Sequence, residues 1–318
     1  MAETSDSRAK LKGGFLAGGK KGWGSFLWMC KIIVPVSFLV TLLQWSGWLH
    51  QVDFLLNPLM RLINLPSEAA LPIISGMLIN IYAAIAIMTV LSFTTEQMTL
   101  IAVFALIAHN LIAEGIIQFR SGINIAKITL IRIGVAILTV LIVSQFLGDT
   151  TESIAALAVP MVDNPLVEAL WVWAIDMAGL LIKIFVIIMT IMIILESLRC
   201  LGWAEYLCNF FKPFMRILGL SNRTAMLWVA AVVFGLMYGG AVIREGAKRE
   251  DLAKAELEHL HISIGINHSM VEDPALFLAL GLNGFWLWVP KFIMAVIVVH
   301  VFRGVRYLLS KIHGSPGS

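Results

Sequence analysis

The stretch GINHSMVEDPALFLALG, residues 265–281, places His268, Glu272 and Asp273 within six positions of an otherwise apolar sequence. Asp273 and Pro274 form a typical helix start, because Asp accepts hydrogen bonds from free backbone N–H groups and Pro fits the first helical position. Pro also disfavours the helical conformation in the residue before it. We therefore expect a helix through His268 to end near Glu272 and a new helix to begin at Pro274.

The sequence around this stretch is that of a membrane protein. Of the 318 residues, 59% are hydrophobic and 14% are charged, and the mean hydropathy is +0.89. Soluble domains are roughly 45–50% apolar and about 25% charged. Long apolar runs are typical of membrane spans, and several long runs here lack any charged residue, among them 32–52, 69–95, 133–148 and 224–243. The sequence predicts an all-α polytopic membrane protein, in which a helix break is tolerated only where protein buries it or where it lines a wet cavity.

The cysteines and the net charge add little. Cys30, Cys200 and Cys208 have neither the spacing of metal ligands nor an even number, so we interpret them as packing residues. The net charge of +3 gives no indication of nucleic acid as a partner. A basic N-terminal segment without a small-residue cleavage site predicts an uncleaved first helix, and we interpret the final GSPGS as a tag remnant.

The chain contains an internal repeat. GWLHQVDFLLNPLMRLINLPSEAA (47–70) matches GWAEYLCNFFKPFMRILGLSNRTA (202–225) at an offset of 155, and HNLIAEG (109–115) matches HSMVEDP (268–274) at an offset of 159. Internal symmetry of this kind is common in transporter folds. We expect a flexible basic segment, a first repeat, an acidic extracytoplasmic connector, a second repeat and a basic tail: residues 1–24, 25–148, 149–167, 168–305 and 306–318.

The charge distribution predicts that the two repeats have inverted topology. Positively charged loops remain in the cytoplasm. No Lys or Arg occurs between Arg132 and Lys183, whereas residues 197–223 and both ends of the chain are basic. The connector is therefore expected outside, and both termini are expected in the cytoplasm, in a cell inner membrane.

Each half must then cross the membrane an odd number of times, although it contains four apolar segments. These are 32–50, 69–92, 97–118 and 124–148 in the first half, and 169–196, 224–243, 259–274 and 275–302 in the second. We expect two inverted repeats, each of three transmembrane helices plus a broken or re-entrant third segment. Eight full spans are the alternative. Segments 51–64 and 203–218 are expected to be interfacial amphipathic helices.

Inverted repeats would bring the two predicted breaks together near the middle of the membrane, where transporters of this design bind substrate. In the first half Glu114 and Gly115 take the places of Asp273 and Pro274. Ionisable groups inside the membrane are costly, about 2.5–3.5 kcal/mol for a centred charge, and mark functional sites. Carboxylates beside His can bind a cation, hold a proton or accept hydrogen bonds from a polar solute. The candidates for substrate or ion binding are His109, Asn110, Glu114, Asn267, His268, Glu272 and Asp273, and those for a metal are His109, Glu114, His268 and Glu272.

Other readings of these residues remain open. Each His–carboxylate pair could instead lock two helices together, and helix capping alone would explain Asp273. Asp176 either faces the cavity, pairs with another helix or lies near the interface. Asn80, Tyr82 and Tyr238 are candidates for polar groups of the cavity, with hydrogen-bonded helix contacts as the alternative.

The repeated blocks NPLMRLINLP and KPFMRILGLS, followed by HNLIAEG and HSMVEDP, resemble the membrane proteins of the nucleoside-recognition, or Gate, family. The resemblance extends over most of residues 25–305. That family includes the spore maturation proteins and the Gate domains of ferrous-iron transporters. The resemblance implies an inverted-repeat, transporter-like fold and does not specify a substrate. This chain lacks the cysteine-containing Gate motif and the GTPase motif of ferrous-iron transporters, and it has no ATP-binding motif.

We therefore expect a secondary transporter or permease that binds a small polar, nucleoside-like solute between the two broken helices. No resident cofactor is expected, and a coupling proton or cation is left open. A divalent metal ion transporter and a non-transporting scaffold or accessory subunit are the alternatives. An enzyme is not expected, because no H-E-x-x-H or serine-elbow motif occurs. The expected partners are the lipid bilayer and the solute or metal ion, and a homo-oligomer is left open.

Overall fold

The computed structural model describes residues 2–47, 53–91, 93–148, 150, 165–233, 235–249 and 252–312. Within these ranges every regular element is a helix. Five helical stretches are long and apolar enough to cross a membrane: Lys10–Trp45, Thr95–Arg120, Ile125–Ser144, Leu166–Cys200 and Gly284–Ile312. The protein is therefore an all-α polytopic membrane protein. Nearly all of the predicted connector and the tag remnant lie outside the described residues.

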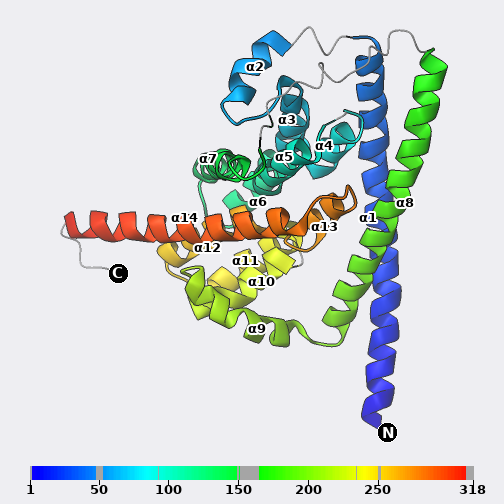
Figure 1. Cartoon of the computed structure of the whole chain (residues 1–318). Helices are drawn as coiled ribbons and strands as arrows, with labels where there is room; N and C mark the ends of the chain where they lie inside the picture. Colours follow the sequence, from blue (N-terminus) through cyan, green and yellow to red (C-terminus); the bar gives the residue numbers. More distant parts are fainter. Residues whose placement is uncertain are drawn as a thin grey trace.

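The first helices of the two halves, α1 (Ala2–Trp45) and α8 (Leu166–Cys200), form an antiparallel hairpin along one side of the molecule (Figure 1). Glycines on α1 permit the close approach. A Cβ atom on Gly14 would lie 2.6 Å from the Cα atom of Ser197, and one on Gly18 would lie 2.5 Å from that of Ile193. Small residues allow helix backbones to approach in this way. Residues 1–24 were expected to form a flexible basic segment, but residues 2–24 belong to α1, in which Gly14 and Gly18 pack on α8.

The second segment of each half is interrupted, although each was expected to be a continuous span. In the first half it forms α3 (Ala70–Leu78) and α4 (Ile81–Met88), and in the second half α10 (Ala225–Val233) and α11 (Leu236–Arg249). Asn80 begins α4, because its side chain accepts a hydrogen bond from the backbone N–H of Ala83 at 3.1 Å. At the offset of 155 the second half has Gly235, whose φ of +86° suits a residue without a Cβ atom.

The third segment of each half is broken, but not at the position that we predicted. The first half has α5 (Thr95–Ala108) and α6 (Leu111–Arg120), and the second has α12 (Lys254–Asn267) and α13 (Glu272–Leu278). Each interruption contains one residue with a φ of 49°, Asn110 or Ser269. Each break therefore begins with one of the two histidines, His109 or His268, and the carboxylates of Glu114 and Asp273 follow it.

Two details of the predicted break are wrong for a physical reason. Helix α13 begins at Glu272, so Asp273 and Pro274 lie inside its first turn and the N-cap residue is Val271. Pro is tolerated in a first turn because N–H groups there have no partner within the helix. In the first half Gly115 lies inside α6, where a Cβ atom would come within 2.9 Å of the Ile125 side chain. Asp273 is thus not the helix cap, and its carboxylate is free for other contacts.

The last segments are α7 (Ile125–Ser144) and α14 (Gly284–Ile312). Each packs against the broken third segment of both halves. The predicted span 275–302 is divided, because Gly281, with a φ of +84°, separates α13 from α14. Helix α14 also continues through residues 306–312, which were assigned to the basic tail. The short helices α2 (Asp53–Arg61) and α9 (Ala204–Ile217) occupy the two predicted amphipathic segments.

Both halves thus contain the same elements in the same order, with short 3₁₀ turns η2 (Ser67–Ala69) and η5 (Asn222–Thr224) at equivalent places. Helices α1 and α8 run in opposite directions, as inverted repeats require (Figure 1). Helix α5 is almost entirely buried and lies in the core, whereas much of α1 and α8 is exposed. The orientation of the halves in a bilayer stays a prediction.

Candidate functional site

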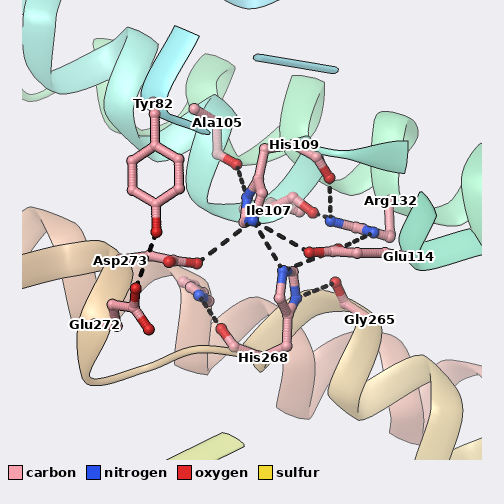
Figure 2. Close-up of polar contacts among 11 residues, drawn as sticks. Tyr82, Ala105, Ile107, His109, Glu114, Arg132, Gly265, His268, Glu272 and Asp273 are labelled. Carbon is pink, nitrogen blue, oxygen red and sulfur yellow. Dashed lines mark hydrogen bonds and ion pairs between the residues drawn. The ribbon is translucent and has the colours of Figure 1, made fainter. Parts of the chain in front are cut away.

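Six buried ionisable side chains meet where the two broken third segments face each other (Figure 2). We call them the central cluster. Their exposed fractions range from 0% to 6%. They come from the α5–α6 break, from α6 and α7, from the α12–α13 break, and from α13 and α14: His109, Glu114, Arg132, His268, Asp273 and Lys291.

The two histidines form the centre of the cluster. The Nε2 atoms of His109 and His268 lie 3.3 Å apart. The Nδ1 atom of His109 lies 2.7 Å from the backbone carbonyl oxygen of Ala105, and that of His268 lies 3.2 Å from the one of Gly265. Carbonyl oxygens only accept hydrogen bonds, so each Nδ1 atom carries a hydrogen. Both Nε2 atoms are then lone-pair acceptors, and one further proton between them would complete a hydrogen bond.

Each carboxylate of the cluster contacts the histidine of the other half. Glu114 Oε2 lies 3.1 Å from His268 Nε2, and Asp273 Oδ2 lies 3.4 Å from His109 Nε2. Glu114 also reaches the histidine of its own half, with Oε1 at 3.3 Å from His109 Nε2. This exchange of contacts joins the two halves through their ionisable groups.

Arg132 and Lys291 complete the cluster, and the sequence analysis did not select either of them. Arg132 places Nη1 2.7 Å from Glu114 Oε2, and it donates to the carbonyl oxygens of Ile107 and His109, both at 2.8 Å. Lys291 donates to the carbonyl oxygen of His268 at 2.9 Å. A helix end leaves its last carbonyl groups without helical partners. The two cations bind carbonyl groups that the breaks release.

Arg132 and Lys291 are separated by the same offset of 159 as the two histidines and as Glu114 and Asp273. Backbone contacts of the two breaks are also alike, although their offsets differ by a few residues. The N–H of Asn110 donates to Gly76 in α3 at 2.8 Å, and that of Met270 donates to Val232 in α10 at 2.9 Å. In each half the broken third segment is thus anchored on the broken second segment. The offset itself is the signal that could have identified Arg132 and Lys291.

Residues 26–144 match the Gate family, which is described as nucleoside recognition. The chain is also 30% identical over 287 residues to the uncharacterized membrane protein YvoD of Bacillus subtilis, covering 89% of this chain and 92% of that relative. The chain belongs to the Gate family. No solved structure matches it. The expected family is confirmed, and the Gate match ends at Ser144, the last residue of α7, so it covers the first half.

The remaining acidic candidate at the break, Glu272, lies beside the central cluster. Its Oε1 atom accepts a hydrogen bond from the Tyr82 hydroxyl group at 2.9 Å. The ring of Trp28 packs edge-on against Tyr82, with the ring centroids 5.5 Å apart. Glu272 therefore connects the second-half break to Tyr82 in α4, and Tyr82 in turn contacts Trp28 in α1.

The other candidates are not brought into the cluster. Asn80 caps α4, and Asn110 contributes its backbone to the break. Asp176 is exposed on α8 and lies in a cleft beside the hairpin. Asn267 is fully buried next to His268, and its amide atoms have no hydrogen-bond partner among the described residues. The side chain of Tyr238 lies outside the described residues.

Part of the cluster has the composition of a metal site. His109, His268 and Asp273 each offer one ligand atom, and these atoms lie within 4.8 Å of one another. Imidazole and carboxylate groups suit divalent transition metals. Glu114 lies next to this set, but its Oε2 atom is already paired with Arg132. Glu272, a predicted metal ligand, pairs with Tyr82 instead.

Proposed function

We propose that this protein is a secondary transporter in which the central cluster couples the passage of a small polar, nucleoside-like solute to a proton. The observation that carries the proposal is the meeting of two equivalent His–carboxylate sets at two helix breaks. Buried ionisable groups in membrane proteins are costly and mark solute or proton pathways. Broken helices at a repeat interface are the usual binding element of secondary transporters. Membership of the Gate family supports this class of function.

The proton has a defined place in this proposal. With neutral imidazoles, two carboxylates face two cations, and the cluster has no net charge. One added proton between His109 Nε2 and His268 Nε2 would pair with Glu114, which contacts both rings. A second proton would place two imidazolium rings with Nε2 atoms 3.3 Å apart and cause repulsion. One added proton therefore turns contacts between acceptors into hydrogen bonds, whereas a second proton is disfavoured.

The solute would bind beside the cluster at the two breaks. Hydroxyl and amino groups would donate to Glu272, and the amide of Asn267 would offer both a donor and an acceptor. The proposal includes no covalent step, no resident cofactor and no enzymatic activity. By the charge distribution, we place the protein in a cell inner membrane with both termini in the cytoplasm.

The test is the thermal stability of the protein in lipid nanodiscs with uridine, adenosine, Mn²⁺ or Zn²⁺, at two pH values. A ligand at 100 times its Kd stabilises the folded state by about 2.7 kcal/mol. We expect a nucleoside to raise the melting temperature, and His268→Ala and Glu272→Ala to abolish this shift. The matched control is His300→Ala, because His300 is exposed on α14. It should retain the shift.

A divalent cation is the second candidate, favoured by the ligand set of His109, His268 and Asp273. Against it, Arg132 and Lys291 already compensate the two carboxylates, so a cation would be bound next to two positive charges. A shift with Mn²⁺ or Zn²⁺ alone would establish this candidate in place of the nucleoside. If no ligand shifts the melting temperature and His268→Ala merely destabilises, the cluster is an interhelical lock.

A further inference from the structure

Two clefts lie between the α1–α8 hairpin and the rest of the molecule. The first, which we call the Asp176 cleft, has a volume of about 280 Å³ and is lined by Thr41, Gln44, Val90 and Asp176, among others. The second, the Glu272 cleft, has a volume of about 170 Å³ and is lined by Lys21, Glu196, Arg199, Ser269 and Glu272, among others. Both clefts contain carboxylates in a largely apolar part of the protein. Since carboxylates are strongly hydrated, we expect water in both clefts.

The charged and polar residues of the two clefts lie at different heights along the hairpin. Lys21 of the Glu272 cleft and Thr41 of the Asp176 cleft are 20 positions apart on α1. On the antiparallel α8, Asp176 and Glu196 are also 20 positions apart. At 1.5 Å per residue, each interval is about 30 Å, which is the thickness of the hydrocarbon core of a bilayer. The two clefts therefore lie toward opposite ends of the α1–α8 hairpin.

The side chains of Glu272, Tyr82 and Trp28 form a chain of contacts that begins at the Glu272 cleft. Trp28, on α1 between Lys21 and Thr41, packs edge-on against Tyr82. Tyr82 is 8% exposed and donates its hydroxyl hydrogen to Glu272 at 2.9 Å. It lies in the first turn of α4, and the residues just after the last turn of α4 line the Asp176 cleft.

The Glu272 cleft lies next to the central cluster. Glu272 lines the cleft, and the next residue, Asp273, contacts His109. Ser269, directly after His268 and in the left-handed backbone conformation, also lines it. The second-half break therefore forms the inner wall of the cleft.

We propose that the Glu272 cleft is a hydrated vestibule through which small polar solutes that carry hydroxyl or ammonium groups reach the central cluster, and that Trp28, Tyr82 and Glu272 form the gate between it and the Asp176 cleft. The carboxylate of Glu272 at the inner end selects hydrogen-bond donors. Lys21 and Arg199, both paired with Glu196, hold the mouth of the vestibule between α1 and α8. The purpose of this path rests on the proposed transport function. Its test, however, measures only whether a water-soluble reagent reaches the clefts.

The test is the reaction of single cysteines with a membrane-impermeant thiol reagent, trimethylammonium-ethyl methanethiosulfonate, in vesicles of known orientation. The three native cysteines are first replaced by serine. Reporters are Ser269→Cys for the Glu272 cleft and Val90→Cys for the Asp176 cleft. Ala102→Cys is the control, because Ala102 is fully buried in α5. We expect Ser269→Cys to react from one side only, Val90→Cys from the opposite side only, and Ala102→Cys from neither.

The gate is tested in the Ser269→Cys background. Tyr82→Ala should make the reporter react from both sides, with at least a tenfold faster reaction from the side that is closed in the parent. Tyr82→Phe keeps the ring and should give a smaller increase. Trp171→Ala is the matched control, since Trp171 is 68% exposed on α8 and should leave the sidedness unchanged. The melting temperature of each variant shows that it is folded.

Three results would overturn the inference. They are reaction of both reporters from the same side, no reaction of Ser269→Cys from either side, and unchanged sidedness in folded Tyr82→Ala. If the labelling is as expected but no solute binds or moves, the vestibule stands and the transport function fails. The two proposals can thus fail separately.

Discussion

The two helix breaks are built from equivalent residues but are held differently. At the first break Arg132 contacts Glu114 and two backbone carbonyl groups, and the interruption between α5 and α6 is His109 and Asn110 alone. At the second break Lys291 donates one hydrogen bond to a single carbonyl group, and residues 268–271 separate α12 from α13. The second break also lines a cleft. The difference indicates that the first break is held by more contacts than the second. We call the first the fixed break and the second the adjustable break.

The largest effect should come from removing the cation of the fixed break. Arg132→Ala leaves Glu114 buried without its guanidinium partner and releases two carbonyl groups, so we expect a loss of about 3–5 kcal/mol in the free energy of unfolding. Lys291→Ala should cost less, about 1.5–3 kcal/mol, because one hydrogen bond to a charged group is lost. Unfolding by SDS in mixed micelles measures both. Equal losses, or the reverse order, would contradict the comparison of the two breaks.

The next largest effect concerns the hairpin, where only α1 contributes the glycine face. In Gly18→Ala the new Cβ atom would lie 2.5 Å from the Cα atom of Ile193, and overpacking of this kind costs about 1–3 kcal/mol. Gly19→Ala is the matched control, because nothing lies within 4 Å of its Cβ position. It should be neutral or slightly stabilising. The same unfolding measurement distinguishes them, and an equal effect of the two substitutions would show that the hairpin is not closely packed.

A smaller effect is expected at the contact between the adjustable break and α4. Tyr82→Phe removes the hydrogen bond to Glu272 and should cost about 1.5 kcal/mol. Tyr206→Phe, at a position that is 72% exposed, is the control and should have no effect. A Tyr82→Phe variant as stable as the parent would mean that this hydrogen bond adds nothing to the closed gate.

The smallest effect is expected at the start of α4. Asn80→Ala removes the side-chain oxygen that caps the helix and should cost about 1 kcal/mol, whereas Asn80→Ser should retain most of the stability because Ser is also a good N-cap. If Asn80→Ala and Asn80→Ser lower the free energy of unfolding equally, the capping hydrogen bond does not stabilise this break. Its counterpart Gly235 has no side chain that could cap a helix, and its φ of +86° is a conformation that favours glycine.

The sequence predicted the membrane fold and four residues of the cluster, for reasons that differ from residue to residue. His109, Glu114, His268 and Asp273 were found because an ionisable group is conspicuous in apolar sequence. Arg132 was used only as a marker of charge, and Lys291 was overlooked within an apolar span. Their offset of 159 matches that of the two histidines, but the carbonyl groups that they bind become free only where the backbone breaks, so the sequence alone does not show their role.

The break positions could not be read from residue preferences alone. The Asp273–Pro274 pair is a strong local start signal, but α13 begins two residues before Pro274, at Glu272, and the break places His268 against His109. The break between α3 and α4 lies in apolar sequence where only Asn80 gives a hint. The basic segment at the N-terminus looked flexible by charge, whereas packing of Gly14 and Gly18 on α8 decides its structure.

The most direct test of the account is proton movement driven by solute. The protein is reconstituted in liposomes that contain a pH-sensitive dye, and uridine or adenosine is added outside. We predict that a nucleoside moves protons with it, and that His109→Gln or His268→Gln abolishes proton movement while His300→Gln preserves it. Nucleoside uptake without proton movement, or proton movement that survives both cluster substitutions, would contradict the claim that the two breaks form one proton-coupled site.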